Sequence, residues 1–372
     1  MASNLEQRHH EDRLTIRDIA RLAGVSVTTV SRVVNDRPDV AADTRDEVLR
    51  VMHRYGFAKQ RPVHTHPTGR TRLIGFALPV GAETYVMRIL AGAAETLLEL
   101  DQHLVLYPTR GGQPGEPTLS DRLSGGLTDG AVIVLPEESG GELSLLARRG
   151  YPFVVADPRL PLGEGIPVVS AAHLAGALAA TEHLLALGHR RVGLITGTPG
   201  WVATRERVEG YRTALAAAGI AFSPELVAGG DFTAATGYEA TRLLLGFRPR
   251  PTAIFASNDN LAVGALRAAL ECGLRVPTDL SIVGVDDTGL AASVWPGLTT
   301  VRQPLAELGR TAVSLLNRLV EGQTVEALRV ELATRLVERD STAPAPPRIV
   351  SVTPRGRSSA GAPVETPANP PG

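Results

Sequence analysis

Polar side chains stand at the ends of three apolar runs in this 372-residue chain, where they can bind a polyhydroxylated ligand. Asp157 ends the run FVVAD, Asn258 and Asp259 end AIFASND, and Asp286 and Asp287 end LSIVGVDD. Carboxylate and amide groups form paired hydrogen bonds with neighbouring hydroxyl groups. These residues therefore predict a site for a small sugar or a related polyol.

An arginine and two aromatic residues complete the predicted site. Arg207 lies with Arg205 near the start of a helix predicted after GLITGTPGW, and its fork of donors suits hydroxyl groups. Phe232 follows the strand-like run LVAGGD and offers a flat apolar face to the C–H surface of a sugar ring. Trp201 either stacks on the ligand in the same way or packs under its loop.

Two alternatives to ligand binding are open for the carboxylates. Asp157, Asp259 or Asp287 can instead cap the helix that follows each of them. Paired carboxylates can also act as acid and base in glycoside cleavage, which makes a sugar hydrolase the enzymatic alternative. The sequence contains no nucleophile elbow, P-loop or cluster of metal ligands, and Cys272 is its one cysteine. We therefore predict no catalytic residue, no cofactor and no metal site.

The elements that must position these side chains are short apolar runs that alternate with amphipathic stretches from Leu73 onward. The runs are continuous rather than alternating, which predicts buried parallel strands at 73–79, 103–109, 130–136, 153–157, 191–197, 253–259 and 280–287. Helices are expected at 86–100, 172–187, 205–218, 237–245 and 261–271. Repeated βα units predict an α/β fold with two doubly wound parallel sheets, each binding ligands at the carboxyl ends of its strands.

Near the N-terminus, residues 15–35 have the layout of a helix-turn-helix. Apolar residues recur at helical spacing in TIRDIARLA, Gly24 interrupts them, and a second apolar run begins after Ser26. Thr15 and Asp18 form a capping-box pattern, and Ser26 is placed to cap the second helix. The later valines of the second helix face inward, which leaves its N-terminal and outer surface for the major groove of DNA.

This segment resembles the DNA-binding headpiece of the lactose-repressor (LacI/GalR) family. The resemblance rests on the run VSVTTVSRVVN and on a third helical segment that ends in RYGF. It covers about residues 14–340, because two lobes of βα units joined by several crossings resemble the periplasmic-binding-protein fold that the family shares. It implies a DNA-binding regulator rather than an enzyme, with a small sugar-like effector bound between the two lobes.

The resemblance and the helix faces together assign roles to individual residues. Val27 and Thr28 are placed to select bases, and Arg32 either reads guanine or clamps phosphate. The residues placed for contacts with the DNA backbone are Thr15, Ser26, Ser31 and Asn35. Thr29 lies on the same outer surface. In related repressors the residues that match Arg207, Asn258 and Asp286 contact sugar hydroxyls, those that match Phe232 and Asp157 line the cavity, and the loop around Tyr85 closes it. Trp201 is an additional aromatic candidate.

The linker after the headpiece departs from the family pattern. Family members usually have a hinge helix here, whose Leu wedges into the minor groove at the dimer axis. His66 occupies the position of that Leu, and Pro62 and Pro67 fall within or beside the expected helix, where proline removes a backbone donor. We predict a short or absent hinge helix over 59–68, with His66 offering hydrogen bonds or positive charge to the minor groove.

These patterns predict the following organisation. Residues 1–13 form a disordered arm, 14–58 the headpiece, 59–72 the hinge, 73–170 with 298–325 the first lobe, 171–297 with 326–340 the second lobe, and 341–372 a disordered Pro-rich tail.

Charge and hydropathy fit this organisation. Residues 1–72 contain 13 Lys and Arg against 9 Asp and Glu, a surplus of four in a chain whose net charge is −1. The basic surplus is therefore local to the predicted DNA-binding region. No apolar segment suggests a secretion signal or a membrane span, so we predict a cytoplasmic protein.

The sequence thus predicts a transcriptional regulator, a repressor of carbohydrate-metabolism genes. One headpiece makes few base contacts, so we expect a homodimer, or a higher oligomer, on a pseudo-palindromic operator. Whether the sugar releases or promotes DNA binding stays open, since some relatives need a corepressor. The alternative of a stand-alone sugar-binding protein would require a secretory signal and no headpiece.

Overall fold

The computed structural model describes residues 15–34, 37, 39–55, 70–80, 83–109, 117–325 and 327–346. Asn35, His66 and most of the predicted hinge lie outside the described residues. The chain divides into two compact units, Met1–Ser170 with Leu305–Leu332 and Ala171–Pro304 with Ala333–Gly372.

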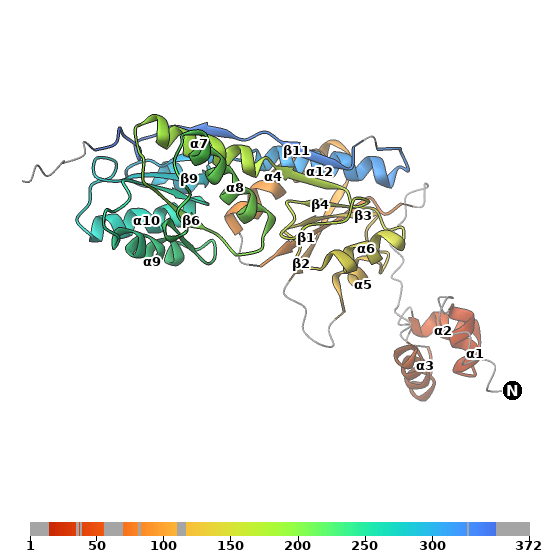
Figure 1. Ribbon diagram of the computed structural model, residues 1–372. Helices are drawn as coiled ribbons and strands as arrows, with labels where there is room; N and C mark the ends of the chain where they lie inside the picture. Colours follow the sequence, from red (N-terminus) through yellow and green to blue (C-terminus); the bar gives the residue numbers. More distant parts are fainter. Residues whose placement is uncertain are drawn as a thin grey trace, which may run out of the picture. The chain divides into compact units, whose positions relative to one another are not determined.

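The N-terminal segment folds as three short helices, α1 (Ile16–Leu22), α2 (Val27–Val34) and α3 (Ala42–Arg54) (Figure 1). Apolar side chains from all three helices form one small core, which contains Ile19, Val30, Val33, Val48 and Met52. The periodic spacing of these residues places them on the inner face of each helix. The predicted helix-turn-helix with a third helix is confirmed.

The first unit contains a six-stranded sheet in the order β11-β5-β4-β3-β1-β2. Its strands are β1 (Leu73–Pro79), β2 (His103–Thr109), β3 (Gly130–Val134), β4 (Phe153–Ala156), β5 (Val168–Ala171) and β11 (Arg329–Leu332). Helices α4 (Glu83–Glu99) and α12 (Leu305–Val320) cover one face, and α5 (Leu119–Leu123) and α6 (Gly140–Arg148) cover the other. The inner strands β1, β3 and β4 are therefore buried on both faces, which is why they read as continuous apolar runs. The prediction that 103–109 is a buried strand is wrong, because β2 lies at the edge of the sheet and most of its residues are partly or fully exposed.

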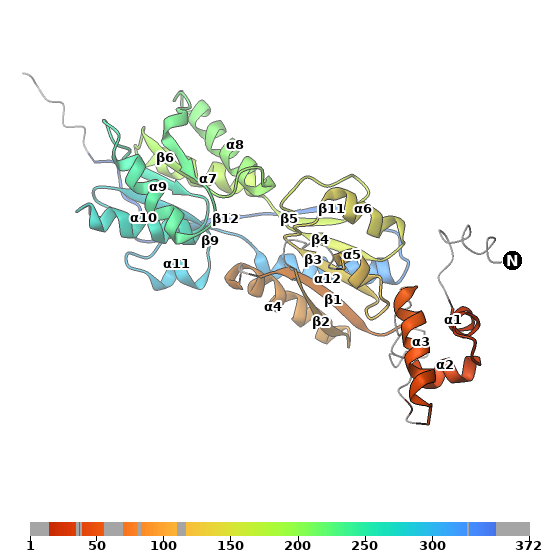
Figure 2. The same ribbon diagram turned by 90° about the horizontal axis from the view of Figure 1, so that it is seen from below.

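The second unit repeats this plan with the sheet order β12-β10-β9-β8-β6-β7. Its strands are β6 (Val192–Thr196), β7 (Val227–Gly229), β8 (Ala253–Ala256), β9 (Ser281–Asp286), β10 (Thr299–Arg302) and β12 (Arg335–Val337). Its helices are α7 (His173–Ala186), α8 (Val202–Ala217), α9 (Ala234–Leu245), α10 (Asp259–Glu271) and α11 (Gly289–Ser293), with the 3₁₀ turn η2 (Pro224–Leu226) (Figure 2). The predicted α/β class with two doubly wound sheets is confirmed.

Strand β8 shows how one strand serves two cores. Ile254 and Ala256 pack with α9 and α10, whereas Ala253 and Phe255 pack with α7 and α8 on the opposite face. All four side chains are fully buried. Neighbouring strands β6, β8, β9 and β10 run parallel, so their carboxyl ends meet at one edge of the sheet.

The predicted crossings between lobes are wrong in two places. Strand β10 lies in the second sheet, where it pairs with β9, and the chain enters the first unit only after Pro304. The stretch 326–340, which was predicted to lie in the second lobe, is divided, because β11 joins the first sheet and β12 pairs antiparallel with β10 in the second. Alternation of apolar and polar residues gives the strand type but not the sheet that a strand joins.

The predicted disordered tail begins too early. Ser341 is fully buried, its hydroxyl donates to Ile282 O (2.6 Å), and it accepts a hydrogen bond from Thr299 N (2.8 Å). The buried ring of His189 lies 3.1 Å from Ala343 O and 3.0 Å from the hydroxyl of Ser281. Residues 341–346 are thus part of the second unit, held by polar contacts that the Ala/Pro-rich composition does not reveal.

Candidate functional site

The caps of the helix-turn-helix form as the sequence predicts. Thr15 caps α1 in a capping box: its backbone N–H donates to Asp18 Oδ2 (2.9 Å), and its hydroxyl oxygen accepts from Asp18 N (3.4 Å). Ser26 Oγ accepts from Thr29 N (3.0 Å) at the start of α2. Gly24, with φ +66°, makes the turn between the helices, a conformation that side chains resist. The two helices therefore have fixed starts.

The outer surface of α2 carries the predicted base-reading residues. Val27 is 46% exposed and Thr28 is exposed, whereas Val30, Val33 and Val34 are buried. Arg32 is exposed and forms an ion pair with Asp39 at 3.4 Å that water reaches from both sides. Such a pair contributes little to folding, so the guanidinium group can leave Asp39 for DNA at small cost.

Two of the residues predicted to contact the DNA backbone have side chains that are hydrogen-bonded within the protein. The hydroxyl groups of Ser26 and Thr29 lie 2.8 Å apart, and Thr15 Oγ1 donates to Asp18 Oδ2 (2.6 Å). Ser31 is half-buried. Thr15 and Ser26 thus act as helix caps, and the helix N-termini that they hold are the natural sites for phosphate.

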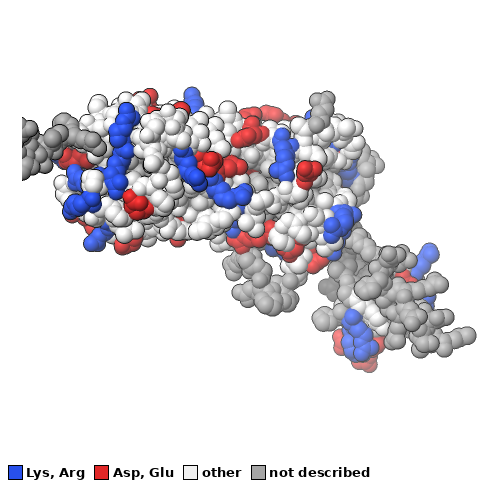
Figure 3. Space-filling model, viewed as in Figure 1, with Lys and Arg blue, Asp and Glu red and all other residues white. Residues whose placement is uncertain are grey.

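Charges of both signs are mixed over one face of the protein. Figure 3 shows Lys and Arg side chains interspersed with Asp and Glu over the face in view. Charges of mixed sign produce no strong long-range field over this face.

The polar residues of the second unit gather at a topological switch point. Strand β6 lies between β7 and β8, and the chain leaves β6 and β8 in opposite directions across the sheet. In open α/β sheets the crevice at such a point is where ligands bind. Trp201 follows β6, Asn258 follows β8 and Asp286 ends β9, so the structure brings these predicted residues to one edge.

Arg207 is 4% exposed on α8 and is held by two acceptors. Its Nη1 donates to Ser257 O (2.7 Å), and its Nη2 donates to Nδ1 of His173 (3.2 Å). The ring of Phe232 lies 5.9 Å from the guanidinium carbon, in cation–π range. The charge of Arg207 is thus buried beside an aromatic face, as expected of a group that binds a ligand.

Trp201 and Phe232 form an aromatic pair beside Arg207. Their ring centroids lie 5.3 Å apart, with the planes tilted by 38°. A Cβ on Gly197 would lie 2.0 Å from the ring of Phe232, so the close approach of that ring requires glycine. Both rings are half-buried, so each keeps an exposed part, and the two alternatives for Trp201, stacking on a ligand or packing under its loop, stay open.

Asn258 has a structural role as well as the predicted one. It is the N-cap of α10, its Oδ1 accepts from Leu261 N (2.8 Å), and its Nδ2 donates to Phe232 O (3.2 Å). The amide oxygen retains a second lone pair for a ligand. Asn258 therefore fixes the Phe232 loop against the start of α10.

Asp286 and Gln303 form a hydrogen-bonded pair at the same edge of the sheet. Gln303 Nε2 donates to Asp286 Oδ1 (2.5 Å), and both side chains are buried. Asp286 has φ 110°, a conformation that non-glycine residues rarely adopt and that is typical of functional sites. Gln303, just after β10, was not among the residues that the sequence predicted.

Several buried polar atoms near these residues have no hydrogen-bond partner among the described residues. They are Arg207 Nε, Ser257 Oγ, Thr204 Oγ1 and Gln303 Oε1. An unpaired buried polar group costs about 1–3 kcal/mol. Such a set, with donors and acceptors together, fits a ligand with several hydroxyl groups.

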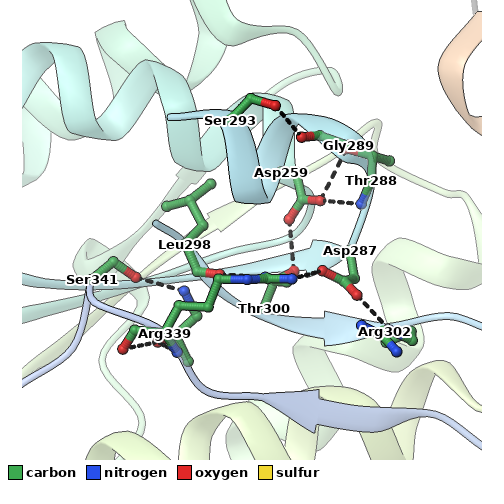
Figure 4. Close-up of polar contacts among 11 residues, drawn as sticks. Asp259, Asp287, Thr288, Gly289, Ser293, Leu298, Thr300, Arg302, Arg339 and Ser341 are labelled. Atoms are coloured by element: carbon green, nitrogen blue, oxygen red, sulfur yellow. Dashed lines mark hydrogen bonds and ion pairs between the residues drawn. The ribbon is translucent and has the colours of Figure 1, made fainter. Parts of the chain in front are cut away.

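The neighbouring carboxylates Asp259 and Asp287 serve the scaffold, as Figure 4 shows. Asp259 accepts from Thr300 Oγ1 (2.6 Å) and from Thr288 N (2.9 Å), and burial raises its pKa to about 6. Asp287 forms ion pairs with Arg302 and with Arg339 (2.5 Å). Neither carboxylate caps the next helix in the way that the sequence alternative supposed.

In the first unit, Tyr85 and Asp157 meet at the carboxyl edge of the sheet. The hydroxyl of Tyr85 donates to Asp157 Oδ2 (2.6 Å). Asp157 is buried with φ 53°. The prediction that a loop carries Tyr85 is wrong, because Tyr85 lies in the first turn of α4. A helix holds the phenol more rigidly than a loop would.

A second charged group at this edge was not predicted. Arg159 forms an ion pair with Glu137 at 2.6 Å, and both side chains are mostly buried. Burial raises the pKa of Glu138, whose Oε2 has no hydrogen-bond partner among the described residues. These groups follow β3 and β4 and therefore lie at the carboxyl edge of the first sheet.

In the described part of the chain, no group of three or more His, Cys, Asp or Glu residues could hold a metal ion. No helix of the described residues is long and apolar enough to cross a membrane.

Comparison with known proteins decides the family. Residues 15–60 match bacterial regulatory proteins of the lacI family, and residues 181–342 match a periplasmic binding protein-like domain. The HTH-type transcriptional regulator CelR of Thermobifida fusca is 35% identical over 337 residues, which are 88% of this chain and 98% of CelR. The chain belongs to the lacI family. Catabolite control protein A of Priestia megaterium is 31% identical, and the match covers 88% of this chain and 99% of that protein.

Solved structures of lacI-family proteins agree with this assignment. A CelR–cellobiose complex has a TM-score of 0.69 and 34% identity, covering 88% of this chain and all of that one. A lac repressor dimer bound to operator and the anti-inducer ONPF has a TM-score of 0.67 and 31% identity, covering 89% and 100%. These relatives are transcription regulators and not enzymes, so the hydrolase alternative loses its support.

Three polar or charged residues of the two units were not predicted from the sequence, and they share one property. His173 and Gln303 of the second unit and Arg159 of the first unit each bond to a residue on another element, so their own sequence positions did not reveal a role. An available signal was the isolated polar residue in an apolar context, as in AAHLAG for His173.

Proposed function

We propose that this lacI-family protein is a repressor of carbohydrate-metabolism genes whose binding to operator DNA is controlled by a small sugar. One observation carries the proposal: a helix-turn-helix headpiece and a buried set of unpaired donors and acceptors at a sheet switch point belong to one chain. The first reads DNA, and the second suits a polyol.

The DNA-contacting residues we propose are those on α2 and its flanks. Exposed Val27 and Thr28 select bases, Arg32 contacts guanine or phosphate, and the capped starts of α1 and α2 approach the backbone. Ser31, Asn35 and His66 are proposed contacts from the sequence alone. A homodimer on a pseudo-palindromic operator doubles these contacts.

Support for a sugar effector comes from relatives as well as from the site. CelR has been solved with cellobiose, and a LacI-family regulator from Enterococcus faecium with ribose. We propose Arg207, Asn258, Asp286, Trp201 and Phe232 as the sugar contacts of the second unit. Tyr85 and Asp157 are the proposed contacts of the first unit, and cellobiose is the first sugar to test.

The mechanism follows from linkage. A sugar changes DNA affinity only if it binds the DNA-competent and DNA-incompetent states with different affinities. A repressor of catabolic genes requires the sugar to favour the incompetent state, so we propose release. Because the operator is in the cytoplasm of a bacterium, we also propose a cytoplasmic location.

The test uses the full chain in two assays. The protein first selects DNA from a random duplex library. Its affinity for the selected DNA is then measured by fluorescence anisotropy, with and without a panel of mono- and disaccharides that includes cellobiose. We expect nanomolar binding to a pseudo-palindrome and weakening by at least one sugar. The proposal would be refuted if the protein enriched no DNA sequence. It would also be refuted if every sugar that binds the protein left its DNA affinity unchanged.

Two variants separate the two activities. Asp286→Asn should keep DNA binding and lose the response to sugar, because it removes a charged acceptor. Thr28→Ala should change the selected DNA sequence and keep sugar binding, because Thr28 is exposed on α2. Loss of both activities in either variant would indicate unfolding, which circular dichroism detects.

A further inference from the structure

The buried charge of Arg207 is held by uncharged acceptors. In the described part of the chain its hydrogen bonds go to Ser257 O and to His173 Nδ1, and its third contact is the ring of Phe232. A guanidinium group that is 4% exposed is costly to bury without fixed partners. Its orientation therefore depends on these few contacts.

The chemistry of arginine determines the state of His173. A guanidinium group has five donors and no acceptor, so the Arg207–His173 hydrogen bond requires a lone pair on Nδ1. The imidazole must then be neutral, with its proton on Nε2. His173 is itself 4% exposed and opens α7, so little solvent competes for this bond.

Close packing of two helices sets the distance between these side chains. A Cβ on Gly210 would lie 2.4 Å from Leu174 O and 2.9 Å from Leu178 N, so α7 and α8 touch through their backbones. Gly210 is one turn after Arg207 on α8, and Leu174 is next to His173 on α7. The contact that brings the helices together thus also brings Nδ1 to the guanidinium group.

We propose that His173 is a positioning residue that orients Arg207 for the effector, an inference that rests on the proposed function of the same site. With Ser257 O and His173 Nδ1 on two different elements, the plane of the guanidinium group is fixed before a ligand arrives. The Nε–H group of Arg207, which has no partner among the described residues, then has a fixed direction before the ligand binds. Fixing a long side chain beforehand removes an ordering cost from binding.

The first experiment needs no sugar. Nuclear magnetic resonance of full-length protein labelled with ¹⁵N in His and Arg reports the tautomer of His173 and the order of the Arg207 Nε–H group. We expect an unprotonated Nδ1 and a slowly exchanging Nε–H in the wild type. His173→Asn should keep the Arg207 signal, because Asn Oδ1 can replace Nδ1 as the acceptor, and His173→Leu should lose it. An Arg207 signal unchanged in His173→Leu would overturn the inference.

The second experiment measures cellobiose binding by calorimetry. We expect His173→Leu to weaken binding about tenfold or more and His173→Asn to stay within about threefold of the wild type. His183→Leu is the matched control, since His183 is on the same helix but bonds to Thr342 instead of Arg207. Equal affinity of His173→Leu and the wild type would overturn the inference.

The two experiments also separate this inference from the proposed function. If the wild type does not bind cellobiose but the Arg207 signal depends on residue 173 as expected, the positioning role stands and the choice of cellobiose as effector fails. If cellobiose binds and both His173 variants bind it like the wild type, the effector proposal stands and the positioning role fails.

Discussion

Replacing Asp287 tests how the carboxyl edge of the second sheet is held together. The two oxygens of its carboxylate accept hydrogen bonds from Arg302, at the end of β10, and from Arg339, after β12 (Figure 4). Arg339 also donates to Leu298 O (2.7 Å). The carboxylate thus joins three segments, and Asp287→Asn should lower the free energy of unfolding of the second unit.

The magnitude follows from the contacts and their exposure. A hydrogen bond to a charged group contributes about 1.5–3 kcal/mol, so two would contribute about 3–6 kcal/mol if fully buried. The side chain of Asp287 is 5% exposed, but those of Arg302 and Arg339 are 39% and 21% exposed, so water replaces part of each interaction. We expect Asp287→Asn to lower the stability by about 2 kcal/mol.

The pH dependence has a definite sign. Burial acts to raise the pKa of Asp287, but hydrogen bonds and charges from Arg339 and Arg302 outweigh it and lower the pKa from its usual value of 3.8. A carboxylate with a lowered pKa in the folded state stabilises the protein above the unfolded pKa and loses this contribution as the pH falls. The difference between wild type and Asp287→Asn should therefore be full at neutral pH and shrink below about pH 4.

Tryptophan fluorescence is the assay that isolates this unit. The chain has two tryptophans, Trp201 and Trp295, and both belong to the second unit. In urea, a loss of about 2 kcal/mol should lower the unfolding midpoint by about 1 M. The control is Glu271→Gln, which breaks an exposed ion pair with Arg267 in the same unit and should leave the midpoint almost unchanged. A midpoint for Asp287→Asn no lower than that of the control would refute this reasoning.

Three further predictions concern other parts of the chain. Gly92→Ala should destabilise the first unit by about 1–3 kcal/mol, measured by circular dichroism, because its Cβ would lie 1.9 Å from Ala306 O. Burial raises the pKa of Asp259 to about 6, so stability should fall as the pH rises from about 4 to 6, and Asp259→Asn should lack this slope in urea titrations. Arg32→Ala should weaken operator binding by about 1–3 kcal/mol if it reads a base, and an equal loss on random DNA would assign it to phosphate.

Much of the fold was predictable because burial on both faces of a sheet leaves continuous apolar runs. The seven long runs correspond to β1–β4, β6, β8 and β9. Strand β5 and helices α5 and α6 were not predicted, since segments of four to nine residues give too little periodicity. The placement of β10 and β11 was wrong because it depends on pairing with distant strands, which local patterns do not encode.

The candidate site was predictable where a polar residue follows a strand. Asp157, Asn258 and Asp286 were found in this way, and the structure places each at the carboxyl edge of its sheet. Gln303 was hidden because the strand before it was assigned to a crossing segment. His173 was hidden because its contact with Arg207 depends on the spacing of two helices, which Gly210 sets.

Asp286 and Asp287 show why sequence position alone does not separate a ligand site from its scaffold. Both end β9, both are buried, and both have positive φ. Their partners differ: two guanidinium groups match the charge of Asp287, whereas Gln303 gives Asp286 a neutral donor. Two arginines neutralise and fix the carboxylate of Asp287, whereas the amide of Gln303 donates a hydrogen bond to Asp286 without neutralising it. Asp287 thus holds the strand end that carries Asp286, the proposed sugar-binding carboxylate, and a loss of Asp287 should act on the proposed site only through the position of its neighbour.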